Sequence, residues 1–488
     1  MEKILSAREM KLCEQFAINE IGIPSEVLME RAAFCVYSEI VSRFDKNADI
    51  LILAGAGNNG ADGIAVGRML FLSGYKVCVN YIGEIEAASK ENLMQYKIAE
   101  NLGIDFILNA DISRFDVVVD ALFGIGLSRN MSHELCAVVD SVNNSDCYVV
   151  SVDIPSGVDS SSGKIYSVAV KADLTVTFGY KKIGHILFPG ADYVGKLAVA
   201  DIGLPECTFN TALSFTNYDL SLLAPRNQNS NKGTYGKVLI VAGCENMAGA
   251  AYLSAKAAYR TGAGLVKVFT HEKNRQIIQT LIPEAVLATY SEDSFAERLE
   301  NAINDADVIV AGPGMGTSVL SKNILESILD FSKVPTVLDA DALNIISENP
   351  DMLSKLPKKV IITPHVKEMS RLVGDSTESI LDDFIDTAKG YAKENNVTCV
   401  LKSARTVTAL PDSNVYINQI GNSGMSTAGS GDVLTGIIAG VLTQGVPFDV
   451  AAPLGVYIHA LAGNKAKETK SERSMIASDI VESLSFVI

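Results

Sequence analysis

The sequence predicts an α/β protein with two domains, each a largely parallel β-sheet covered by helices on both faces. Short apolar runs rich in β-branched residues recur along the chain, and longer segments with helical spacing separate many of them. Strands that are apolar along their whole length are typical of a parallel sheet that is buried on both faces. A polar stretch near the middle of the chain interrupts the alternation, which then restarts.

The first 45 residues contain helical patterns and no strand signal. Apolar residues recur at helical spacing in 6–22 and 25–44. Ser6 and Ser25 are suitable N-caps, and Glu9 is placed to complete a capping box with Ser6. The rest of this half contains strand-like runs at residues 49–55, 76–83, 116–124, 148–155, 173–179 and 196–203.

The domain boundary is expected between residues 216 and 217. The stretch from 204 to 235 is polar, rich in Asn, Gly and Pro, and has no long period, so it separates domains 1–216 and 217–488. In the second domain, Pro411 to Asn414 lie between two segments spaced like a β-hairpin, and helices follow from Gly429 onward. Strand-like runs precede this hairpin at residues 237–243, 264–270, 307–314, 335–341, 359–365 and 397–403.

Composition and charge exclude several classes of protein. Lys and Arg number 41 against 57 Asp and Glu, a net charge of −16, which is unsuited to general nucleic-acid binding. No segment has about 18 apolar residues without a charge, and the N-terminus is too charged for a signal peptide, so we expect no membrane span. A composition of 48% hydrophobic and 20% charged residues is that of a globular protein. Because parallel-sheet domains often assemble, we expect a homo-oligomer.

The cysteines indicate neither a disulfide framework nor a zinc site. None forms a CxxC pair, and none lies in a Cys/His cluster with zinc spacing. We therefore expect reduced, mostly buried thiols in a cytoplasmic protein. The eight residues are Cys13, Cys35, Cys78, Cys136, Cys147, Cys207, Cys244 and Cys399.

A glycine-rich turn joins the first strand of the N-terminal half to a helix. Residues 55–60 match GxGxxG, whose glycines let backbone approach a pyrophosphate at a helix N-terminus. A dinucleotide site usually has an acidic residue about 20 residues further on, and only Glu84 follows the second strand here. A ligand-free tight turn is the other simple interpretation. A site with more than a phosphate cradle is favoured by the polar residues Asn58, Asn59 and Asp62.

Two further strands end in aspartates beside loops. Asp120 precedes the glycine-rich loop 124–130, and Asp153 lies in VDIPSGVD with Ser156 close behind. The carboxyl ends of parallel strands line one crevice, so we expect these groups to meet the turn at 58–62. A single such Asp is usually an Asx-turn or a helix cap, but three successive polar strand ends favour a ligand site.

The most specific motif of the C-terminal half is GNSGMSTAGSGDVLTGIIAG at 421–440. Gly429, Gly431 and Asp432 stand where a loop opens an apolar helix, whose N–H groups would stabilise charge on a transferred phosphoryl group. A carboxylate there can take a proton from an attacking hydroxyl. The sequence GxxxxGK[ST] is absent, which excludes a P-loop. A glycine-rich helix start capped by Asp432 is the alternative.

AGAGNNGADG, DALFGIGLSR and VDIPSGVDSSSG, which follow the helical segments in this order, together resemble the NAD(P)H-hydrate epimerase domain. The match covers nearly the whole N-terminal half. It implies a Rossmann-like three-layer α/β/α sheet, with Asp153 in hydrate binding and proton transfer. The hydrate-binding residues that it implies are Asn58, Asn59, Gly60, Ala61, Asp62, Gly124, Ile125, Gly126, Leu127, Ser128, Arg129, Asn130 and Asp153.

The same resemblance implies a potassium ion held by oxygens of Asn59, Asp120 and Ser156. An all-oxygen ligand set suits a hard cation. TFGYKKIGH at 177–185 is similar to the family's TFGAPKPG segment. Lys182 aligns with the lysine of that segment, and Lys181 and Ile183 replace its prolines.

SNKGTYGKVLIVAG, GAGLV, VAGPGMG, LDADALN, TPHVKE and GSGD, in this order, resemble the ADP-dependent NAD(P)H-hydrate dehydratase of the ribokinase-like superfamily. The match covers nearly the whole C-terminal half and implies a ribokinase-like α/β/α sheet. Lys367 replaces the glycine of the usual TPHxGE motif, which predicts an altered loop geometry with function retained. The hydrate-binding residues implied are Gly314, His365, Val366, Lys367, Glu368 and Asp432.

The resemblance also implies a nucleotide site in the C-terminal half. Asp339 and Asp341 of LDADALN are candidates to order magnesium, and a structural role for them is equally open. The ADP-binding residues implied are Lys402, Ser403, Ala404, Arg405, Thr406, Asn422, Ser423, Gly424, Met425, Ser426, Thr427, Ala428, Gly429, Ser430 and Gly431.

Both resemblances imply one substrate and therefore a bifunctional repair enzyme, an isomerase joined to a lyase. The N-terminal domain would interconvert the R and S epimers of NADHX and NADPHX. The C-terminal domain would use Mg²⁺ and ADP, with Asp432 as base, to convert the S epimer to NAD(P)H, AMP and phosphate. Two alternatives stay open: an ATP-dependent ribokinase-like vitamin kinase fused to a dinucleotide-binding domain, and a non-enzymatic nucleotide sensor. The motifs do not decide between ADP and ATP.

Overall fold

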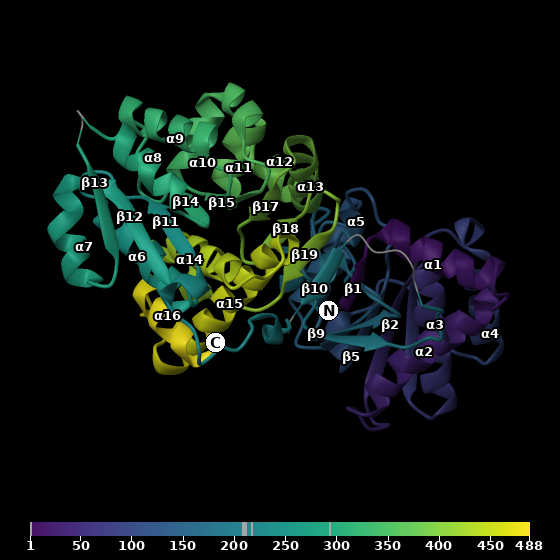
Figure 1. Ribbon diagram of the computed structural model, residues 1–488. Coiled ribbons are helices and arrows are strands. Elements are labelled where there is room, and N and C mark those ends of the chain that lie inside the picture. Colours follow the sequence, from purple (N-terminus) through teal and green to yellow (C-terminus); the bar gives the residue numbers. More distant parts are fainter. Residues whose placement is uncertain (1, 207–211, 216–217, 292–293) are drawn as a thin grey trace. The chain divides into compact units, whose positions relative to one another are not determined.

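The computed structural model of the chain contains two compact units (Figure 1). It describes residues 2–206, 212–215, 218–291 and 294–488. The N-terminal unit is Lys3–Ala212, and the C-terminal unit is Leu213–Ile488 together with Glu2. The boundary expected between residues 216 and 217 lies outside the described residues and stays a prediction.

The N-terminal unit contains a seven-stranded sheet in which all neighbouring strands are parallel. Its order is β4 (Asp105–Ile107), β3 (Lys76–Ile82), β2 (Asp49–Gly55), β5 (Val117–Ala121), β6 (Tyr148–Val152), β7 (Leu174–Phe178) and β9 (Lys196–Ala200). Since the chain passes to opposite sides of β2 to form β3 and β5, the crevice at the carboxyl ends of β2 and β5 is a topological switch point. The α-helices are α1 (Ala7–Asn19), α2 (Ser25–Val41), α3 (Asn58–Leu72), α4 (Lys90–Asn101) and α5 (His133–Asn143).

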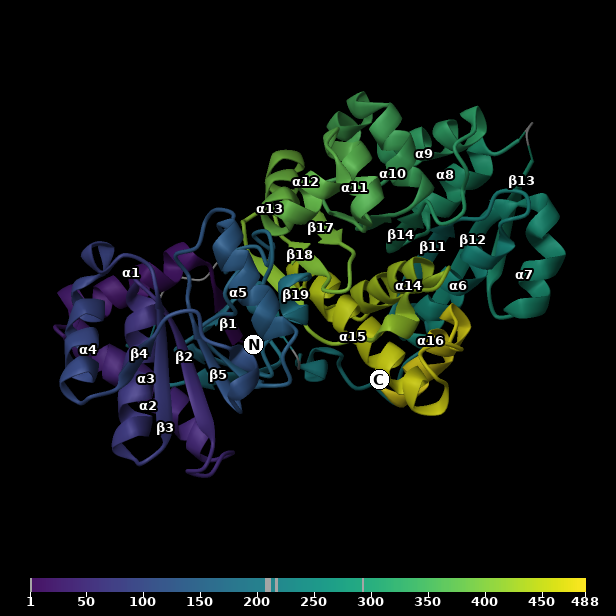
Figure 2. The ribbon, with the colours of Figure 1, turned by 180° about the vertical axis from the view of Figure 1, so that it is seen from behind.

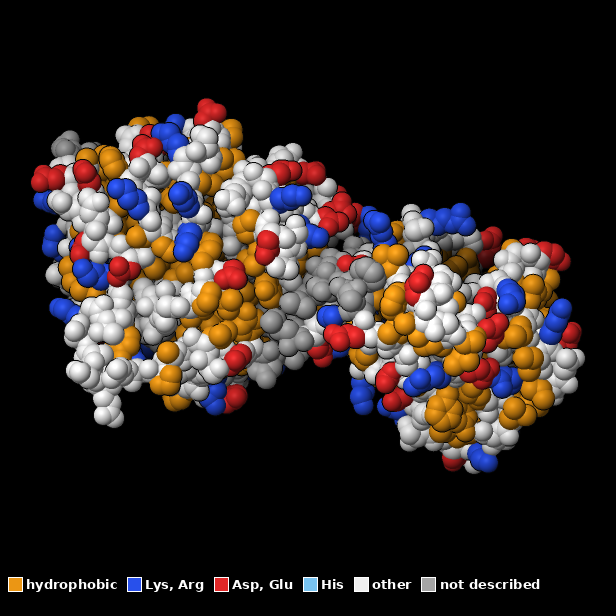
Figure 3. Space-filling view, turned by 45° about the vertical axis from the view of Figure 1, so that its right-hand side comes forward, with side chains coloured by type: hydrophobic (Ala, Val, Ile, Leu, Met, Phe, Trp, Pro, Cys, Tyr) orange, Lys and Arg blue, Asp and Glu red, His pale blue; other side chains and the backbone are white. Residues whose placement is uncertain are grey.

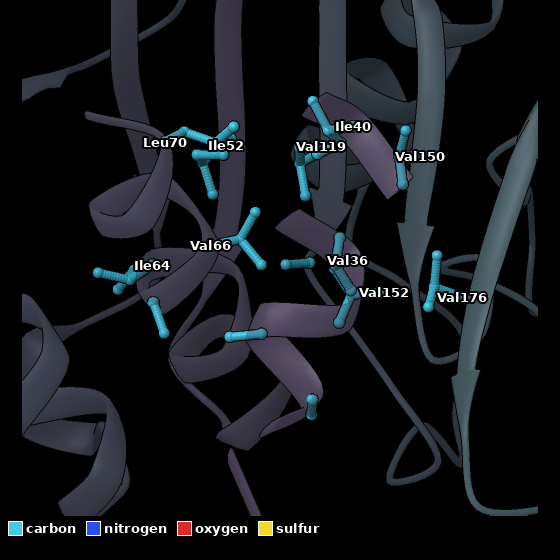
Figure 4. Close-up of a cluster of buried hydrophobic side chains, with 14 of the residues drawn as sticks. Val36, Ile40, Ile52, Ile64, Val66, Leu70, Val119, Val150, Val152 and Val176 are labelled. Carbon is cyan, nitrogen blue, oxygen red and sulfur yellow. The ribbon is translucent and has the colours of Figure 1, made fainter. Parts of the chain in front are cut away.

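Successive residues of β2 pack into two different cores, because side chains alternate across a strand. Ile52 packs on the face covered by α2 and α3, in one cluster with Val36 and Val66 (Figure 4). Leu51 and Leu53 pack on the other face, with residues of α5. The predicted three-layer arrangement of this unit is therefore confirmed.

The C-terminal unit is built on a mixed sheet. Its strands are parallel from β13 to β17, β18 runs antiparallel to both of its neighbours, and β10 pairs in parallel with β19. The expected hairpin at 411–414 joins β18 to β19. The order is β13 (Val286–Tyr290), β12 (Leu265–His271), β11 (Lys237–Val241), β14 (Val308–Ala311), β15 (Thr336–Leu338), β16 (Val360–Ile362), β17 (Thr398–Leu401), β18 (Val407–Ala409), β19 (Val415–Asn418) and β10 (Ala212–Phe215).

Helices cover both faces of this sheet (Figures 1 and 2). One face carries α6 (Ala248–Arg260), α7 (Arg275–Leu281), α14 (Ser430–Thr443), α15 (Phe448–Thr469) and α16 (Ala477–Ser483). The opposite face carries α8 (Ala296–Asn304), α9 (Val319–Phe331), α10 (Asp341–Glu348), α11 (Val366–Val373), α12 (Thr377–Asp382) and α13 (Phe384–Asn395).

Several strands and one helix cap differ from the expectation. The absence of a strand signal before residue 45 was misleading, because β1 (Glu2–Leu5) pairs with β8 (Lys181–Lys182). Strands β4 and β13 were also missed. β1 and β4 are too short to show a period, and all of these pairings depend on distant segments. The capping box of Ser6 and Glu9 is confirmed, but Pro24 caps α2, and Ser25 instead donates a hydrogen bond to Glu91.

The expectation of eight reduced, mostly buried thiols was wrong for several cysteines. Cys13 is disulfide-bonded, and Cys207 lies outside the described residues. Spacing along the chain cannot reveal such a bond, because only the fold brings two sulfurs together. Among the free thiols of the described residues, only Cys399 is buried, and the half-buried ones are Cys35, Cys78, Cys136, Cys147 and Cys244.

The surface carries charges of both signs. Acidic and basic side chains are interspersed on the face shown in Figure 3, without a continuous basic stripe of the kind that follows a nucleic-acid backbone. Within the described ranges, no helix is long and apolar enough to cross a membrane.

Candidate active sites

A cavity of about 120 Å³ opens at the carboxyl edge of the N-terminal sheet. Asn58 and Asp62, both predicted site residues, line it from the start of α3. Glu14 of α1 lines it as well, and no local sequence feature had singled this residue out. The remaining lining residues are Ile18, Ser25, Leu28, Met29, Ala32, Glu91, Phe178 and Ile202.

The predicted segment 58–62 forms the first turn of α3. Gly57 is the N-cap, and Gly60 packs so closely on the strand that a Cβ atom there would lie 1.8 Å from the carbonyl oxygen of Gly55. Asn92 Nδ2 donates to the carbonyl oxygens of Gly55 and Gly57, each at 2.9 Å. The glycine pattern therefore serves close helix–strand packing, and the carbonyl groups of the turn are satisfied within the protein.

Asp153 lies in a buried ion pair directly after β6. Lys182 Nζ is 2.6 Å from Asp153 Oδ1 and also donates to Thr177 Oγ1 at 2.8 Å. Burial raises the pKa of Asp153, but the charge and hydrogen bond of Lys182, with smaller contributions from His185 and Thr177, together lower it by more, so this pKa lies below its usual value. The strand-end aspartate is thus held as a carboxylate, in a left-handed backbone conformation with φ of 66°.

His185 fixes the backbone beside Asp153. Its Nδ1 accepts a hydrogen bond from the Lys182 N–H at 3.0 Å, so its Nε2 carries the proton and donates to the Asp153 carbonyl at 2.9 Å. Burial and the neighbouring Lys182 charge lower the pKa of His185 to about 3. The imidazole is therefore neutral, and its two hydrogen bonds hold the backbone of Lys182 and Asp153 in place.

The three residues expected to hold a cation lie around the ends of β5 and β6. Asp120 is fully buried and accepts hydrogen bonds from Ser151 Oγ at 2.8 Å, Ser156 N at 2.9 Å and Ser156 Oγ at 2.5 Å. These donors are all neutral, and burial raises the pKa of Asp120. The buried Asn59 Nδ2 has no hydrogen-bond partner among the described residues.

The loop 124–130 divides into two parts. A Cβ atom on Gly124 would lie 3.1 Å from Asn59 Oδ1, which brings this end of the loop to the start of α3. Ile125 packs against the cluster formed by Leu5, Met10 and Cys13. Gly126 and the end of the loop, which comprises Ser128, Arg129 and Asn130, are exposed. These last three residues do not line the cavity.

A larger cavity of about 460 Å³ lies in the C-terminal unit. It brings together most of the predicted nucleotide and hydrate residues: His365, Lys402, Ser403, Ala404, Thr406, Asn422, Met425, Ser426, Ser430, Gly431 and Asp432. Other predicted residues do not line it: Gly314, Val366, Lys367, Glu368, Arg405, Ser423, Gly424, Thr427, Ala428 and Gly429. Ala340, Gly421 and Leu434, which belong to the motifs recognised in the sequence, also line it. Lining residues that the sequence had not indicated are Asn418, Ile420, Val456, His459 and Ala460.

The N-terminus of α14 points into this cavity. Gly429 caps the helix in the left-handed conformation, with φ of 88°. A Cβ atom on Gly431 would lie 3.1 Å from Lys402 Nζ and 3.5 Å from Asp339 Oδ2. The backbone N–H groups of Gly431 and Asp432 and the Lys402 ammonium therefore converge on one place, as a site for a phosphoryl anion requires.

Asp432, in the first turn of α14, has the properties of a general base. Burial, and then the negative charge of Asp339, raise its pKa to about 7, although Lys402 acts in the opposite direction. Lys402 itself stays charged. Burial lowers its pKa, but Asp339, whose Oδ1 lies at 2.7 Å, together with the charges of Glu368 and Asp432 raises it by more. A carboxylate with a pKa near the working pH can both accept and release a proton.

The TPHVKE segment forms the start of α11. His365 caps the helix, with Nδ1 accepting from the backbone N–H groups of Lys367 at 3.0 Å and Glu368 at 3.3 Å. Lys367 is helical and exposed, with no positive φ, so lysine replaces the family's glycine without backbone strain. Whether this loop differs in geometry from that of relatives stays a prediction.

His459 of α15 is the most informative residue that the sequence did not indicate. It is buried, and its Nε2 lies 3.2 Å from Ser430 Oγ at the start of α14. Burial and the charge of Lys402 lower its pKa to about 4, so the imidazole is neutral. Its place inside a long apolar helix left no local signal of function.

Comparisons with known proteins give a separate family match for each half of the chain. Residues 25–184 match the family model for the YjeF-related protein N-terminus, and residues 238–485 match that for NAD(P)H-hydrate dehydratase. The bifunctional NAD(P)H-hydrate repair enzyme of Moorella thermoacetica is 37% identical, over 99% of this chain and 96% of its own. That of Thermofilum pendens is 34% identical, over 99% and 95%. A crystal structure of a ribokinase-like superfamily protein from Enterococcus faecalis superposes with a TM-score of 0.51 and 28% identity, covering 58% of this chain and 97% of that one.

Proposed function

This chain belongs to the family of bifunctional NAD(P)H-hydrate repair enzymes, and from that premise we propose that it repairs hydrated nicotinamide nucleotides. One activity epimerises R- and S-NAD(P)HX. The other dehydrates S-NAD(P)HX to NAD(P)H while ADP is converted to AMP and phosphate. The observation that carries the proposal is the convergence of Asp432, the start of α14 and Lys402 on one cavity.

In the dehydratase reaction, Asp432 takes the proton of the C6 hydroxyl. The hydroxyl oxygen attacks the β-phosphoryl group of ADP, and AMP leaves. The N–H groups at Gly431 and the Lys402 ammonium stabilise the charge that develops on the phosphoryl oxygens. The ring then expels phosphate and loses a proton from C5, which restores NAD(P)H.

The epimerase reaction is placed at the carboxyl edge of the N-terminal sheet. Asn58 and Asp62 line the cavity there, and Asp153 lies nearby within the Lys182 ion pair. We assign hydrate binding to the segment 58–62, to Asp153 and to the loop 124–130, whose exposed end lies outside the cavity of about 120 Å³. Because one dehydratase site is stereospecific, prior epimerisation lets it clear both epimers.

Potassium is proposed for the epimerase unit. The neutral partners of the buried Asp120 carboxylate leave its charge uncompensated, and Ser156 Oγ and Asn59 Oδ1 would supply further oxygens. This donor set fits a hard monovalent cation. When bound, the ion would neutralise Asp120 and order the ends of β5 and β6.

Magnesium is proposed for the dehydratase unit. Across the described ranges there is no group of three or more His, Cys, Asp or Glu residues that could hold a metal. This agrees with Mg²⁺ bound mainly through nucleotide phosphates and one or two carboxylates, here Asp339 or Asp341. The homo-oligomeric state and the cytoplasmic location remain proposals.

Turnover of both epimers tests the function. Mixed R- and S-NADHX is incubated with the full chain, Mg²⁺ and either ADP or ATP, and NADH formation is followed together with the epimer ratio. We expect complete conversion of both epimers with ADP. Failure to form NADH with either nucleotide would refute the dehydratase assignment, and a stable phosphorylated product would favour the vitamin-kinase alternative.

A further inference from the structure

Glu14 is a carboxylate of the N-terminal cavity to which no role has been assigned. It lies on α1, half-buried, and lines the same cavity as Asn58 and Asp62. It forms no hydrogen bond or ion pair with the described residues, although neighbouring carboxylates do. Its oxygens are therefore available to a ligand in the cavity.

The other acidic groups around this cavity are less suited to moving a proton. Asp153 is held as a carboxylate by Lys182 at 2.6 Å and Thr177 at 3.0 Å. Burial, followed by the charges of Asp153 and Glu14, raises the pKa of Asp62 well above its usual value, which favours its neutral, hydrogen-bond-donating form. Glu91, across the cavity, is engaged by Ser25 Oγ at 2.9 Å.

The pKa of Glu14 lies between the lowered pKa of Asp153 and the strongly raised pKa of Asp62. Burial and the negative charge of Asp153 raise the pKa of Glu14 to about 7, while Lys182 and Lys11 act in the opposite direction. The carboxyl and carboxylate forms are then both well populated near neutral pH. Phe178 and Met29 add apolar surface to the cavity wall, which favours direct proton transfer over exchange with bulk water.

We propose that Glu14 is the acid–base residue of epimerisation and carries one proton between the C6 hydroxyl oxygen and the ring nitrogen N1. This inference rests on the proposed epimerase function. The Glu14 carboxylate takes the hydroxyl proton, the C6–O bond becomes a carbonyl, the C6–N1 bond breaks and its electron pair goes to N1. The Glu14 carboxyl then protonates N1.

Reclosure is the reverse of this opening. After rotation about C5–C6, Glu14 removes the N1 proton, N1 attacks the other face of the aldehyde, and the new oxyanion takes the proton back. The residue ends in its starting form, and no oxidant, reductant or second reactant is consumed. Asp62, as a neutral donor, and the Asp153–Lys182 pair would position the opened chain.

The test compares Glu14→Gln with Glu20→Gln in the full chain. Glu20 is exposed at the end of the same helix, so its replacement makes the same charge change away from the cavity. Purified S-NADHX is incubated without nucleotide, and appearance of the R epimer is followed by chromatography across pH, against an enzyme-free background. Circular dichroism and thermal unfolding report that both units of each variant are folded, and ADP-dependent NADH formation from the S epimer confirms that the C-terminal unit is intact.

We expect Glu14→Gln to lower the kcat of epimerisation by about 100-fold or more with KM little changed, as removal of an acid–base group does. Wild-type kcat/KM should fall below about pH 7, the Glu14→Gln profile should lose this limb, and Glu14→Asp should keep it with reduced kcat. Epimerisation by Glu14→Gln within threefold of Glu20→Gln would overturn the proposal. If the wild type forms the R epimer no faster than the enzyme-free background, the proposed epimerase function itself is refuted.

Discussion

Replacing Asp432 by asparagine separates the chemical role of this carboxylate from its place in the fold. Asparagine keeps the size of the side chain at the start of α14 but cannot accept the hydroxyl proton. A positioned general base contributes about 10²–10⁴-fold to a rate. We therefore expect kcat of NADH formation to fall by at least about 100-fold, equivalent to about 2.7 kcal/mol in the barrier, with KM for S-NADHX little changed.

The pH profile of kcat/KM provides a second, independent test of Asp432 as the base. Burial and the charge of Asp339 raise the pKa of Asp432 to about 7, and only the deprotonated form can act as the base. Wild-type kcat/KM should therefore be on a plateau above about pH 8 and fall about tenfold for each pH unit below about 6. Asp432→Asn should lack this limb, because the titrating group is gone.

The assay follows NADH absorbance from purified S-NADHX with ADP and Mg²⁺. Asp449→Asn is the matched control, since Asp449 is an exposed carboxylate in the first turn of α15. Epimer interconversion without nucleotide, measured on the same preparations, should be equal in all three proteins. The reasoning is refuted if Asp432→Asn keeps more than a third of the control's kcat or retains the acid limb.

Three further perturbations follow from the N-terminal unit. Gly60→Ala should lower the free energy of unfolding in urea by about 2 kcal/mol or more, because the new Cβ atom would lie 1.8 Å from a strand carbonyl oxygen. The control Gly57→Ala, whose Cβ atom would have no neighbour within 4 Å, should change this free energy by less than about 1 kcal/mol. Equal effects of the two substitutions would contradict the packing role of Gly60. Lys182→Met should cost about 3–5 kcal/mol at neutral pH by leaving the Asp153 carboxylate buried and unpaired. Since burial alone raises the pKa of Asp153, the loss should shrink as acid protonates this group, and a loss that grows toward low pH would count against the ion pair. Asp120→Asn, or replacement of K⁺ by a tetraalkylammonium ion, should slow epimerisation and leave dehydration intact; an epimerase indifferent to both would rule out the potassium site.

The two α/β units and most of their strands could be predicted from the sequence, because local signals specify them. Apolar runs such as 49–55 and 237–243 are buried on both faces and need no partner to be recognised. The glycine-rich turns at 55–60 and 429–431 were recognised from their glycines. Gly60 leaves no room for a Cβ atom against the strand, and Gly429 is in the left-handed region. The resemblance carried by these motifs agrees with the family to which the chain belongs.

What only the tertiary structure decided concerns pairings between distant segments. Strand β1 exists because residues 4 and 5 meet residues 181 and 182, and no local period announces such a contact. The protonation states of Asp153, Asp432 and Glu14 depend on burial and on charges brought in from other elements, so a motif can place a carboxylate but cannot set its pKa. His459 and Glu14 lie in ordinary helical patterns, and it is the packing of those helices against the strand ends that brings both side chains into the cavities.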